Sequence, residues 1–302
     1  MRLIDIHTHG IGGYDTRTSN EEDILKMAEI HASAGVSAII PTIYPDTIEM
    51  MRENMLAVKR AMEMQGAGDQ GSEVAAGFSL RSSEKSEVRA TILGVHLEGP
   101  FLNSKRCGAL RENSFIEPAE YNLRAFLDGF EDMVKIITIA PEINGAINII
   151  RKITDMGIIV SMGHSDATYA EAEAGFNAGA KGITHIFNAM RGIHHREPGI
   201  AGFGLLNKDI YIEVIGDPYH LHLKTLELIF RTKNPERIIL ISDSVKDTKF
   251  PEGDMGQSVI DYSGRLQGGS MTIARSSGRL VELGFDEDTI KRCITENPAS
   301  YL

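Results

Sequence analysis

Two histidines, His7 and His9, end an apolar run close to the start of the chain. Alternate residues of a β-strand project to the same side, so we expect both imidazoles to point at one spot. Glycines at positions 10, 12 and 13 follow at once and predict a loop that a ligand or other backbone can approach closely. Two imidazoles that converge at the end of a strand make half of a metal site.

Three further side chains have the chemistry to complete that site. Glu98 ends another apolar run and is followed by a Gly-Pro pair, while His164 and His185 each follow an apolar run of their own. Taken singly, each of the three is more often a structural or solvated residue than a ligand. Together with the first pair they form a set of nitrogen and oxygen donors without cysteine. This set predicts a site for one or two divalent ions, zinc or iron above all, with manganese and other divalent ions left open.

Asp243 is the candidate catalytic residue, because it follows the last predicted strand. A carboxylate beside a metal-bound water can accept the proton of that water and later deliver it to a leaving group. Alone, such an aspartate would be read as a helix cap or a turn residue. Its place at a strand end, like that of the candidate ligands, favours the catalytic interpretation.

The elements that would position these residues alternate along the chain. Ile- and Val-rich runs predict strands at residues 3–6, 37–42, 91–97, 133–140, 157–162, 182–185, 210–215 and 237–242. Amphipathic stretches between them predict helices at residues 21–34, 46–64, 118–127, 143–156, 168–178 and 222–231. Asn20 and Asp46 are candidate N-terminal caps, and Gly35, Gly157 and Gly179 follow predicted helix ends. Continuous apolar strands are typical of parallel sheets that are buried on both faces.

This α/β alternation predicts a TIM-like (β/α)8 barrel rather than an open, doubly wound sheet. The deciding feature is that the polar candidates, including His96, Asp217 and His220, lie at or just after the carboxyl ends of predicted strands. In a barrel these ends form one ring, whereas an open sheet would spread them along a line. We expect residues 1–302 to form a single barrel domain of the metal-dependent hydrolase type. Residues 66–86 read as an insertion or loop in which 74–78 could form a short strand, and 251–269 as a hairpin excursion.

Composition excludes several classes of protein. The formal net charge of −11 argues against nonspecific nucleic-acid binding, but it permits a small anionic substrate that needs only one or two local cations. Cys107 and Cys293 are too few for a disulfide framework or a thiolate cluster. No apolar stretch reaches the roughly 18 residues of a membrane span, and no signal peptide is recognisable. We therefore expect a soluble, cytoplasmic protein.

The motifs around these residues resemble those of the amidohydrolase superfamily, and within it the N-acetylglucosamine-6-phosphate deacetylases. The resemblance covers nearly the whole chain and is carried by residues 96–101 (HLEGPF), 163–168 (GHSDAT), 184–190 (THIFNAM), 196–202 (REPGIAG) and by Asp243, in the family's order and spacing. It implies a hydrolase of amino-sugar catabolism that removes the N-acetyl group from N-acetylglucosamine 6-phosphate. The products would be glucosamine 6-phosphate and acetate.

The resemblance also implies a role for each site residue. Glu98, His164 and His185 resemble the ligands of the main metal, and His7 and His9 those of a second metal that Glu98 would bridge. Asp243 is similar to the family's general base and acid. The substrate-binding residues would be Asn188, the backbone of Ala189, His220 and Arg196, of which Arg196 would reach the phosphate across a homodimer interface. For Arg196 the alternative is an ordinary arginine of a surface loop.

Two departures from the family pattern bear on specificity and architecture. Where the family usually has Gly-Ala-His or Gly-Thr-His, this chain has Gly108-Ala109-Leu110, and leucine cannot donate a hydrogen bond to a sugar. The family also carries a small β-sandwich built from residues before the first strand and after the barrel, which we expect to be absent here.

Three alternative functions remain open. The substrate could be N-acetylgalactosamine 6-phosphate or another acetamido compound. The chain could be another amidohydrolase that acts on a cyclic amide, although such enzymes usually use a carboxylated lysine, and no lysine ends a suitable strand. It could also be a catalytically silent barrel that binds sugar phosphates, although the complete set of candidate ligands and Asp243 counts against decay.

Overall fold

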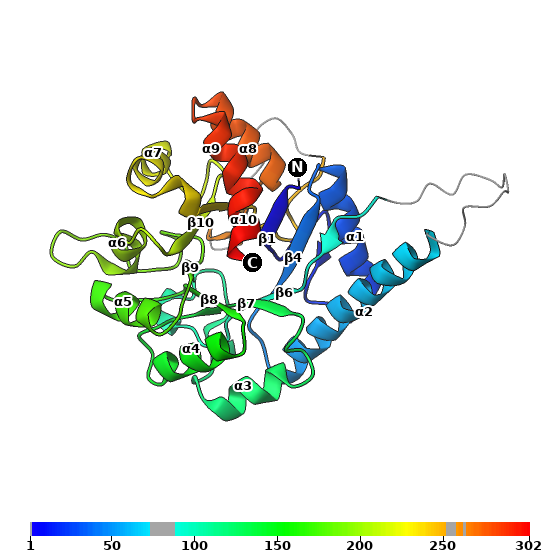
Figure 1. The fold of residues 1–302 in the computed structure, drawn as a ribbon, viewed down its shortest axis with the longest axis horizontal. Helices are drawn as coiled ribbons and strands as arrows, with labels where there is room; N and C mark the ends of the chain where they lie inside the picture. Colours follow the sequence, from blue (N-terminus) through cyan, green and yellow to red (C-terminus); the bar gives the residue numbers. More distant parts are fainter. Residues whose placement is uncertain (1, 73–87, 252–257, 262–263) are drawn as a thin grey trace.

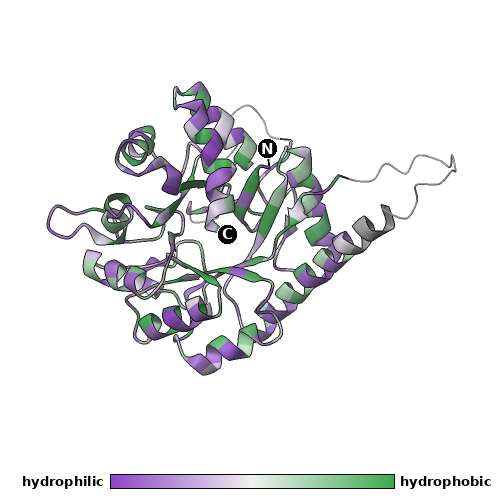
Figure 2. Ribbon diagram, viewed as in Figure 1, coloured by the Kyte–Doolittle hydropathy of each residue, from purple (hydrophilic) through white to green (hydrophobic). Residues whose placement is uncertain are grey.

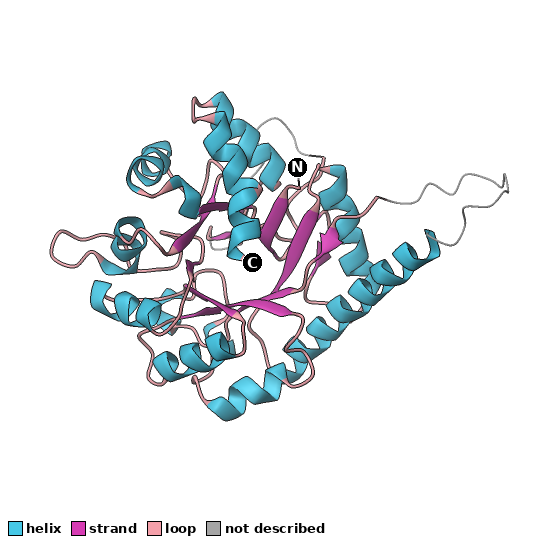
Figure 3. Ribbon diagram, in the orientation of Figure 1, coloured by secondary structure: helices cyan, strands magenta, loops and turns pink. Residues whose placement is uncertain are grey.

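The computed structural model describes residues 2–72, 88–251, 258–261 and 264–302. Within these residues a parallel sheet winds into a barrel whose strands neighbour one another in chain order (Figures 1 and 3). The barrel strands are β1 (Ile4–Thr8), β4 (Ala38–Ile43), β6 (Val95–Glu98), β7 (Val134–Ile139), β8 (Ile159–Met162), β9 (Gly182–Ile183), β10 (Tyr211–Ile215) and β11 (Ile238–Ile241). The short strand β5 (Thr91–Ile92) pairs with β4 beside this path. The predicted (β/α)8 architecture is therefore confirmed.

Hydrogen bonds beyond the ends of β11 and β1 join the last strand to the first. The amide of Asp243 donates to the carbonyl of His7 at 2.9 Å, and the amide of His9 donates to the carbonyl of Ser244 at 2.7 Å. Thr8 and Ser244 form a parallel bridge. Two candidate site segments that lie far apart in the sequence are thus neighbours in the barrel wall.

Helices surround the barrel, as Figure 3 shows. They are α1 (Glu21–Ser33), α2 (Ile48–Ser72), α3 (Glu120–Leu127), α4 (Ala146–Asp155), α5 (Tyr169–Asn177), α6 (Gly199–Leu206), α7 (Leu223–Thr232), α8 (Ile273–Glu282), α9 (Glu287–Ile294) and α10 (Glu296–Tyr301). Figure 2 shows a largely hydrophobic sheet, whereas the surrounding helices mix hydrophobic and hydrophilic residues. This is the pattern expected of helices that bury one side against a sheet.

Two hydrophobic cores hold the strands in place. The larger core lies between the strands and the helices, and the smaller one fills the barrel with isoleucines from β1, β4, β7, β8, β10 and β11. Tyr301 of α10 joins this inner core, and α10 lies across one end of the barrel (Figure 1). Gly182 leaves the space for this packing, because a Cβ there would overlap the Tyr301 hydroxyl. A filled interior leaves the carboxyl ends of the strands as the place for a site.

An irregularity in β1 aims its two histidines into the barrel. Asp5 pairs with Ile39 of β4, but Thr8 pairs with Pro41, so β1 contains one extra residue between these two points. A bulge of this kind changes the face on which the following side chains project. Ile6 accordingly belongs to the inner core, while the next residue, His7, also faces inward. Strict alternation, which we expected from the sequence, holds on each side of the bulge but not across it.

Several predicted boundaries need correction. Residues 91–97 form two short strands rather than one, because the chain turns at Gly94, whose φ is +146°. Residues 66–72, expected in a loop, continue helix α2, and that helix begins at Ile48, with the Thr47 hydroxyl rather than Asp46 accepting from the amide of Met50. The possible strand at 74–78 lies outside the described residues.

Four helices that the sequence did not predict are α6, α8, α9 and α10. Helix α6 contains three glycines, which lower helix propensity, but Gly204 is needed because a Cβ there would lie 2.6 Å from the side chain of Ile183. In the predicted excursion, β12 (Val259–Ile260) and β13 (Leu266–Gly268) pair antiparallel as expected of a hairpin, and residues 252–257 and 262–263 lie outside the described residues. Among the described residues, no helix combines the length and hydrophobicity that crossing a membrane requires.

The pH dependence of stability tests the packing around β1. His31 of α1 is fully buried against Thr8, and burial lowers the pKa of its imidazole from 6.5 to about 4. Between these two values the unfolded chain binds a proton that the folded chain does not, so stability falls as the pH falls. We expect the wild type to lose about 2 kcal/mol more than His31→Gln between pH 7 and pH 5 in denaturant titrations. The control His195→Gln changes an exposed side chain and should follow the wild type; parallel curves for His31→Gln and the wild type would contradict the assignment.

Candidate metal centre and active site

Three candidate ligands meet at the carboxyl ends of β6, β8 and β9. Nε2 of His164 and Nε2 of His185 each lie 3.0 Å from Oε1 of Glu98, and the two nitrogens are 3.2 Å apart. All three side chains are buried. The structure therefore places these residues close enough to share one ion.

A second group lies beside the first and shares Glu98. Nε2 of His7 and Nε2 of His9 are 3.3 Å apart, and Oδ1 of Asp243 is 3.4 Å from the His7 nitrogen. Oε2 of Glu98 lies 3.2 Å from Nε2 of His9. Glu98 thus contacts both groups, because Oε1 lies 3.0 Å from His164 and His185 and 3.6 Å from His7, and this placement suits a bridging carboxylate.

The hydrogen bonds of these rings decide whether the donor set fits a cation. Nδ1 of His9 lies 3.0 Å from the carbonyl of Thr42, and Nδ1 of His164 lies 2.9 Å from the carbonyl of Arg106. A carbonyl only accepts, so in the neutral ring Nδ1 holds the proton and Nε2 has a lone pair. Nε2 of both rings therefore directs a lone pair at the Glu98 carboxylate, at 3.2 Å for His9 and 3.0 Å for His164, and neither ring can donate to it. Acceptor atoms this close repel one another unless a cation lies between them. The residues therefore fit a divalent ion with nitrogen and oxygen ligands.

Unusual backbone conformations aim the side chains at this point. The described part of the chain has five non-glycine residues with positive φ: His164 (46°), His185 (30°), Phe187 (74°), Ala189 (47°) and Asp243 (49°). All belong to the segments at the carboxyl ends of β8, β9 and β11. Each such conformation costs about 1–2 kcal/mol, so the surrounding barrel must stabilise it. Backbone strain of this kind is typical of functional sites.

Asp243 lies next to the candidate ligands, and its side chain is largely buried, with 13% of its surface exposed. Burial raises the pKa of its carboxyl above the usual range, and the negative charges of Glu98 and Glu213 act in the same direction, while His185 and His220 oppose them. A carboxyl in these surroundings holds a proton more readily than one in water. This property suits a group that accepts a proton and later releases it.

A cavity of about 410 Å³ opens above the two groups. Glu98, His164, His185 and Asp243 line it together with the candidate substrate residues Asn188, Ala189 and His220. Asp217 accepts a hydrogen bond from Nδ1 of His220 at 3.0 Å, which leaves Nε2 of that ring for the cavity. Leu110 also lines the cavity, so the departure from the family pattern lies at the place where substrate would bind.

Arg196 is the one predicted substrate-binding residue that does not line this cavity. It lies exposed in the loop between β9 and α6, which projects away from the barrel in Figure 1. Among the described residues that line the cavity there is one arginine, Arg265 from the β12–β13 hairpin. Its guanidinium lies 3.4 Å from the carbonyl of Gly108. A cation for a phosphate could thus come from Arg265 within the chain, or from Arg196 only through a second chain.

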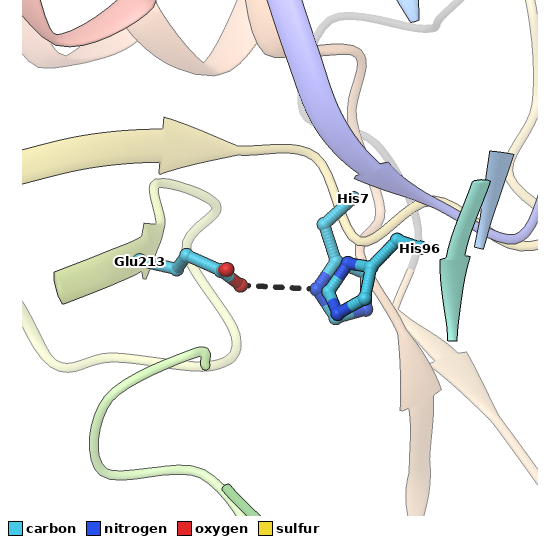
Figure 4. A group of neighbouring side chains, drawn as sticks. All are labelled: His7, His96 and Glu213. Carbon is cyan, nitrogen blue, oxygen red and sulfur yellow. Dashed lines mark hydrogen bonds and ion pairs between the residues drawn. The ribbon is translucent and has the colours of Figure 1, made fainter. Parts of the chain in front are cut away.

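The structure adds residues to the site that the sequence analysis did not predict. Tyr44, just beyond β4, stacks on the His9 ring with centroids 3.8 Å apart, and the Arg17 guanidinium lies 3.7 Å from the centroid of the tyrosine ring. Figure 4 shows Glu213 of β10 pointing at His7, with Oε2 lying 3.0 Å from Nδ1 of the ring. A tyrosine directly after a strand was a usable signal, whereas a glutamate within an apolar strand indicates no partner.

His96, expected among the polar residues at the strand ends, has a supporting position below the site. Its Nδ1 lies 3.3 Å from the carbonyl of Ile6, and its Nε2 lies 2.8 Å from the hydroxyl of Thr138. The His96 ring packs edge-on against His7, with centroids 4.6 Å apart. Both of its nitrogens are therefore occupied by the barrel wall.

Comparison with known proteins places the chain among sugar-phosphate deacetylases. No family model matches it. The chain is 30% identical over 290 residues to the N-acetylgalactosamine-6-phosphate deacetylase of Escherichia coli O157:H7, covering 93% of this chain and 71% of that protein. It is 33% identical over 283 residues to the N-acetylglucosamine-6-phosphate deacetylase of Vibrio furnissii, covering 90% of this chain but 65% of that relative's length.

Solved structures agree with the sequence relatives. The fold matches a mutant N-acetyl-D-glucosamine-6-phosphate deacetylase from Mycobacterium smegmatis, in complex with N-acetyl-D-glucosamine 6-phosphate, with a TM-score of 0.84 and 26% identity. The match covers 100% of this chain and 77% of that one. The corresponding enzyme from Thermotoga maritima matches with a TM-score of 0.80 and 26% identity, over 99% of this chain and 77% of that one. The chain therefore belongs to the family of N-acetylglucosamine-6-phosphate and N-acetylgalactosamine-6-phosphate deacetylases.

Proposed function

We propose that this protein is a metal-dependent hydrolase that removes the N-acetyl group from N-acetylglucosamine 6-phosphate, giving glucosamine 6-phosphate and acetate. The observation that carries the proposal is the position of Glu98, whose carboxylate contacts both groups of imidazoles at the floor of a cavity. The relatives and the Mycobacterium complex support the substrate class.

The proposed metal ligands are Glu98, His164 and His185 for one position, with His7 and His9 for a second. Zinc and iron suit this donor set, and manganese is a further candidate. When bound, the metal supplies Lewis-acid chemistry: it polarises the amide carbonyl and lowers the pKa of water toward neutrality.

Asp243 provides the proton transfer. Its carboxylate accepts a proton from the attacking water as the water oxygen bonds to the acetyl carbon. When the carbon–nitrogen bond breaks, the same carboxyl gives that proton to the departing amine, and the acyl carbon leaves as acetate. Because burial raises the pKa of this group, it can hold the proton between the two steps.

The substrate would be held above the metal ligands by Asn188, the backbone of Ala189 and His220, all of which line the cavity. Leu110 offers an apolar contact where the family usually has a histidine. N-acetylgalactosamine 6-phosphate, the substrate named for the Escherichia coli relative, or another acetamido compound is therefore the second candidate.

Arg196 is proposed to bind the phosphate from a partner subunit in a homodimer, because it lies in a projecting loop away from its own cavity. A planar guanidinium matches two phosphate oxygens, and this geometry favours arginine over lysine. We also propose a cytoplasmic location, where sugar phosphates are metabolised.

A substrate panel tests the proposed reaction. Acetate release is measured for N-acetylglucosamine 6-phosphate, N-acetylgalactosamine 6-phosphate and the two unphosphorylated sugars, with added zinc, iron(II) or manganese. We expect N-acetylglucosamine 6-phosphate to have the highest kcat/KM, by about tenfold or more over the unphosphorylated sugars, because charge-assisted hydrogen bonds to phosphate contribute about 1.5–3 kcal/mol. Preferred hydrolysis of a cyclic amide would replace this proposal, and metal binding without any turnover would indicate a silent barrel.

The role of Asp243 is tested by Asp243→Asn. The asparagine keeps the shape but cannot accept the proton, so we expect kcat to fall by roughly 10²–10⁴-fold while the metal content stays unchanged. Asp247→Asn, at an exposed position four residues further along the chain, serves as the matched control. Full activity of Asp243→Asn would rule out the acid–base role.

The source of the phosphate-binding cation is tested with Arg196→Gln and Arg265→Gln. If Arg196 acts across an interface, its variant should raise KM for phosphorylated substrate about tenfold, and sedimentation should show a dimer, while unphosphorylated substrate is unaffected. Arg231→Gln, on the exposed side of α7, is the control. A larger KM effect for Arg265→Gln than for Arg196→Gln would assign the phosphate contact to the chain's own hairpin.

A further inference from the structure

The ring of His7 is held by a buried carboxylate that lies outside the cavity. Oε2 of Glu213 is 3.0 Å from Nδ1 of His7, and the two side chains are 2% and 0% exposed (Figure 4). Glu213 is not among the residues that line the cavity, so it has no access to substrate. Its effect on the site therefore passes through the residues that it contacts, which are the His7 ring and the backbone of His185.

A glutamate buried at this depth lowers the stability of the fold. The other residues of β10 from Ile212 to Ile215 are apolar, and Oε1 of Glu213 has no hydrogen-bond partner among the described residues. Removing a carboxylate from water costs several kcal/mol, which a single hydrogen bond does not recover. A leucine would pack here at lower cost, so the stability of the barrel does not explain the glutamate.

The contact decides the chemical form of His7. In its ionised form the Glu213 carboxyl only accepts, and in that form Nδ1 of His7 donates to it and leaves the lone pair on Nε2. That nitrogen faces His9, Glu98 and Asp243, at 3.3 to 3.6 Å. A carboxylate behind a histidine also increases the basicity of the ring and thereby its affinity for a metal.

The other candidate histidines lack this support. His9 and His164 donate from Nδ1 to neutral backbone carbonyls, and Nδ1 of His185 has no hydrogen-bond partner in the described residues. Among the four rings, His7 is thus the one that a carboxylate orients. The adjacent His96 ring, fixed by Thr138 and the Ile6 carbonyl, restricts rotation of His7 and offers no free nitrogen for a separate ion at Glu213.

We propose that Glu213 is a positioning residue that makes the His7–His9 half of the site a second metal position. The inference rests on the metal dependence in the proposed function and extends it, since it assigns occupancy of the second position to a carboxylate beneath the site. The position formed by Glu98, His164 and His185 should depend on Glu213 far less, because none of these three side chains hydrogen-bonds to it and only the backbone of His185 interacts with its carboxyl.

Metal stoichiometry and affinity test this proposal without any substrate. The full chain is equilibrated with excess zinc, dialysed to remove unbound metal and assayed for ions per chain, and chelator competition then gives the affinity of each ion. We expect two ions in the wild type, with the weaker-bound ion losing roughly 10- to 100-fold in affinity in Glu213→Leu. Glu213→Gln keeps an acceptor for Nδ1 but not the charge. Its affinity for the weaker-bound ion should lie between those of the wild type and Glu213→Leu.

Controls separate positioning from a loss of folding. Thermal unfolding of both variants identifies a destabilised chain, and Glu236→Gln changes an exposed glutamate outside the barrel. Cobalt(II) spectra add a second readout, in which the variants should lose the bands of one site and keep those of the other.

The outcomes either support or overturn the proposal. It is overturned if Glu213→Leu and Glu213→Gln keep two ions with wild-type affinity, if both ions weaken equally, or if the wild type binds a single ion that neither variant affects. If the Glu213 variants lose one ion and the wild type releases no acetate from any substrate, the role of Glu213 is supported and the proposed deacetylation is refuted.

Discussion

The convergence of lone pairs at one mouth of the barrel is the constraint on which the rest of this structure depends. Imidazole nitrogens and two carboxylates lie 3.0 to 3.7 Å from their nearest neighbours in a largely buried cluster. In a medium of low dielectric constant, such groups repel strongly unless a cation or a proton lies between them. The chain can hold them there only because each is attached to a strand whose position is set by packing elsewhere.

That packing comes from two layers of apolar side chains. Isoleucines fill the barrel, and a larger core lies between the strands and the helices, so the strand ends have little freedom to separate. Local backbone features then direct the side chains at the ends of these rigid strands toward the site. The bulge in β1 turns His7 inward, and positive φ angles at His164, His185 and Asp243 do the same at three other strand ends. The cost of these conformations is met by the stability of the barrel as a whole.

Local patterns in the chain were enough to predict the barrel, because parallel buried strands are continuous apolar runs and their ends are marked by polar residues and glycine. The same reasoning failed for α6, because the glycines that allow close packing on β9 also lower the helix propensity of this segment. It also failed within β1, where one extra residue against β4 cannot be recognised without knowing the partner strand. The proposed role of Arg196 also lies beyond what local patterns can predict, because it involves a second chain.

The sequence by itself determined the fold class, the types of donor atom and the strand ends that carry them. These properties follow from hydrophobic periodicity and side-chain chemistry, which are local. Only the tertiary structure decided that Glu98 lies between two groups of imidazoles, that Tyr44 covers His9 and that Glu213 lies behind His7. Each of these contacts joins residues from different strands, and a strand's own residues do not specify which distant side chain will face them once the barrel is formed.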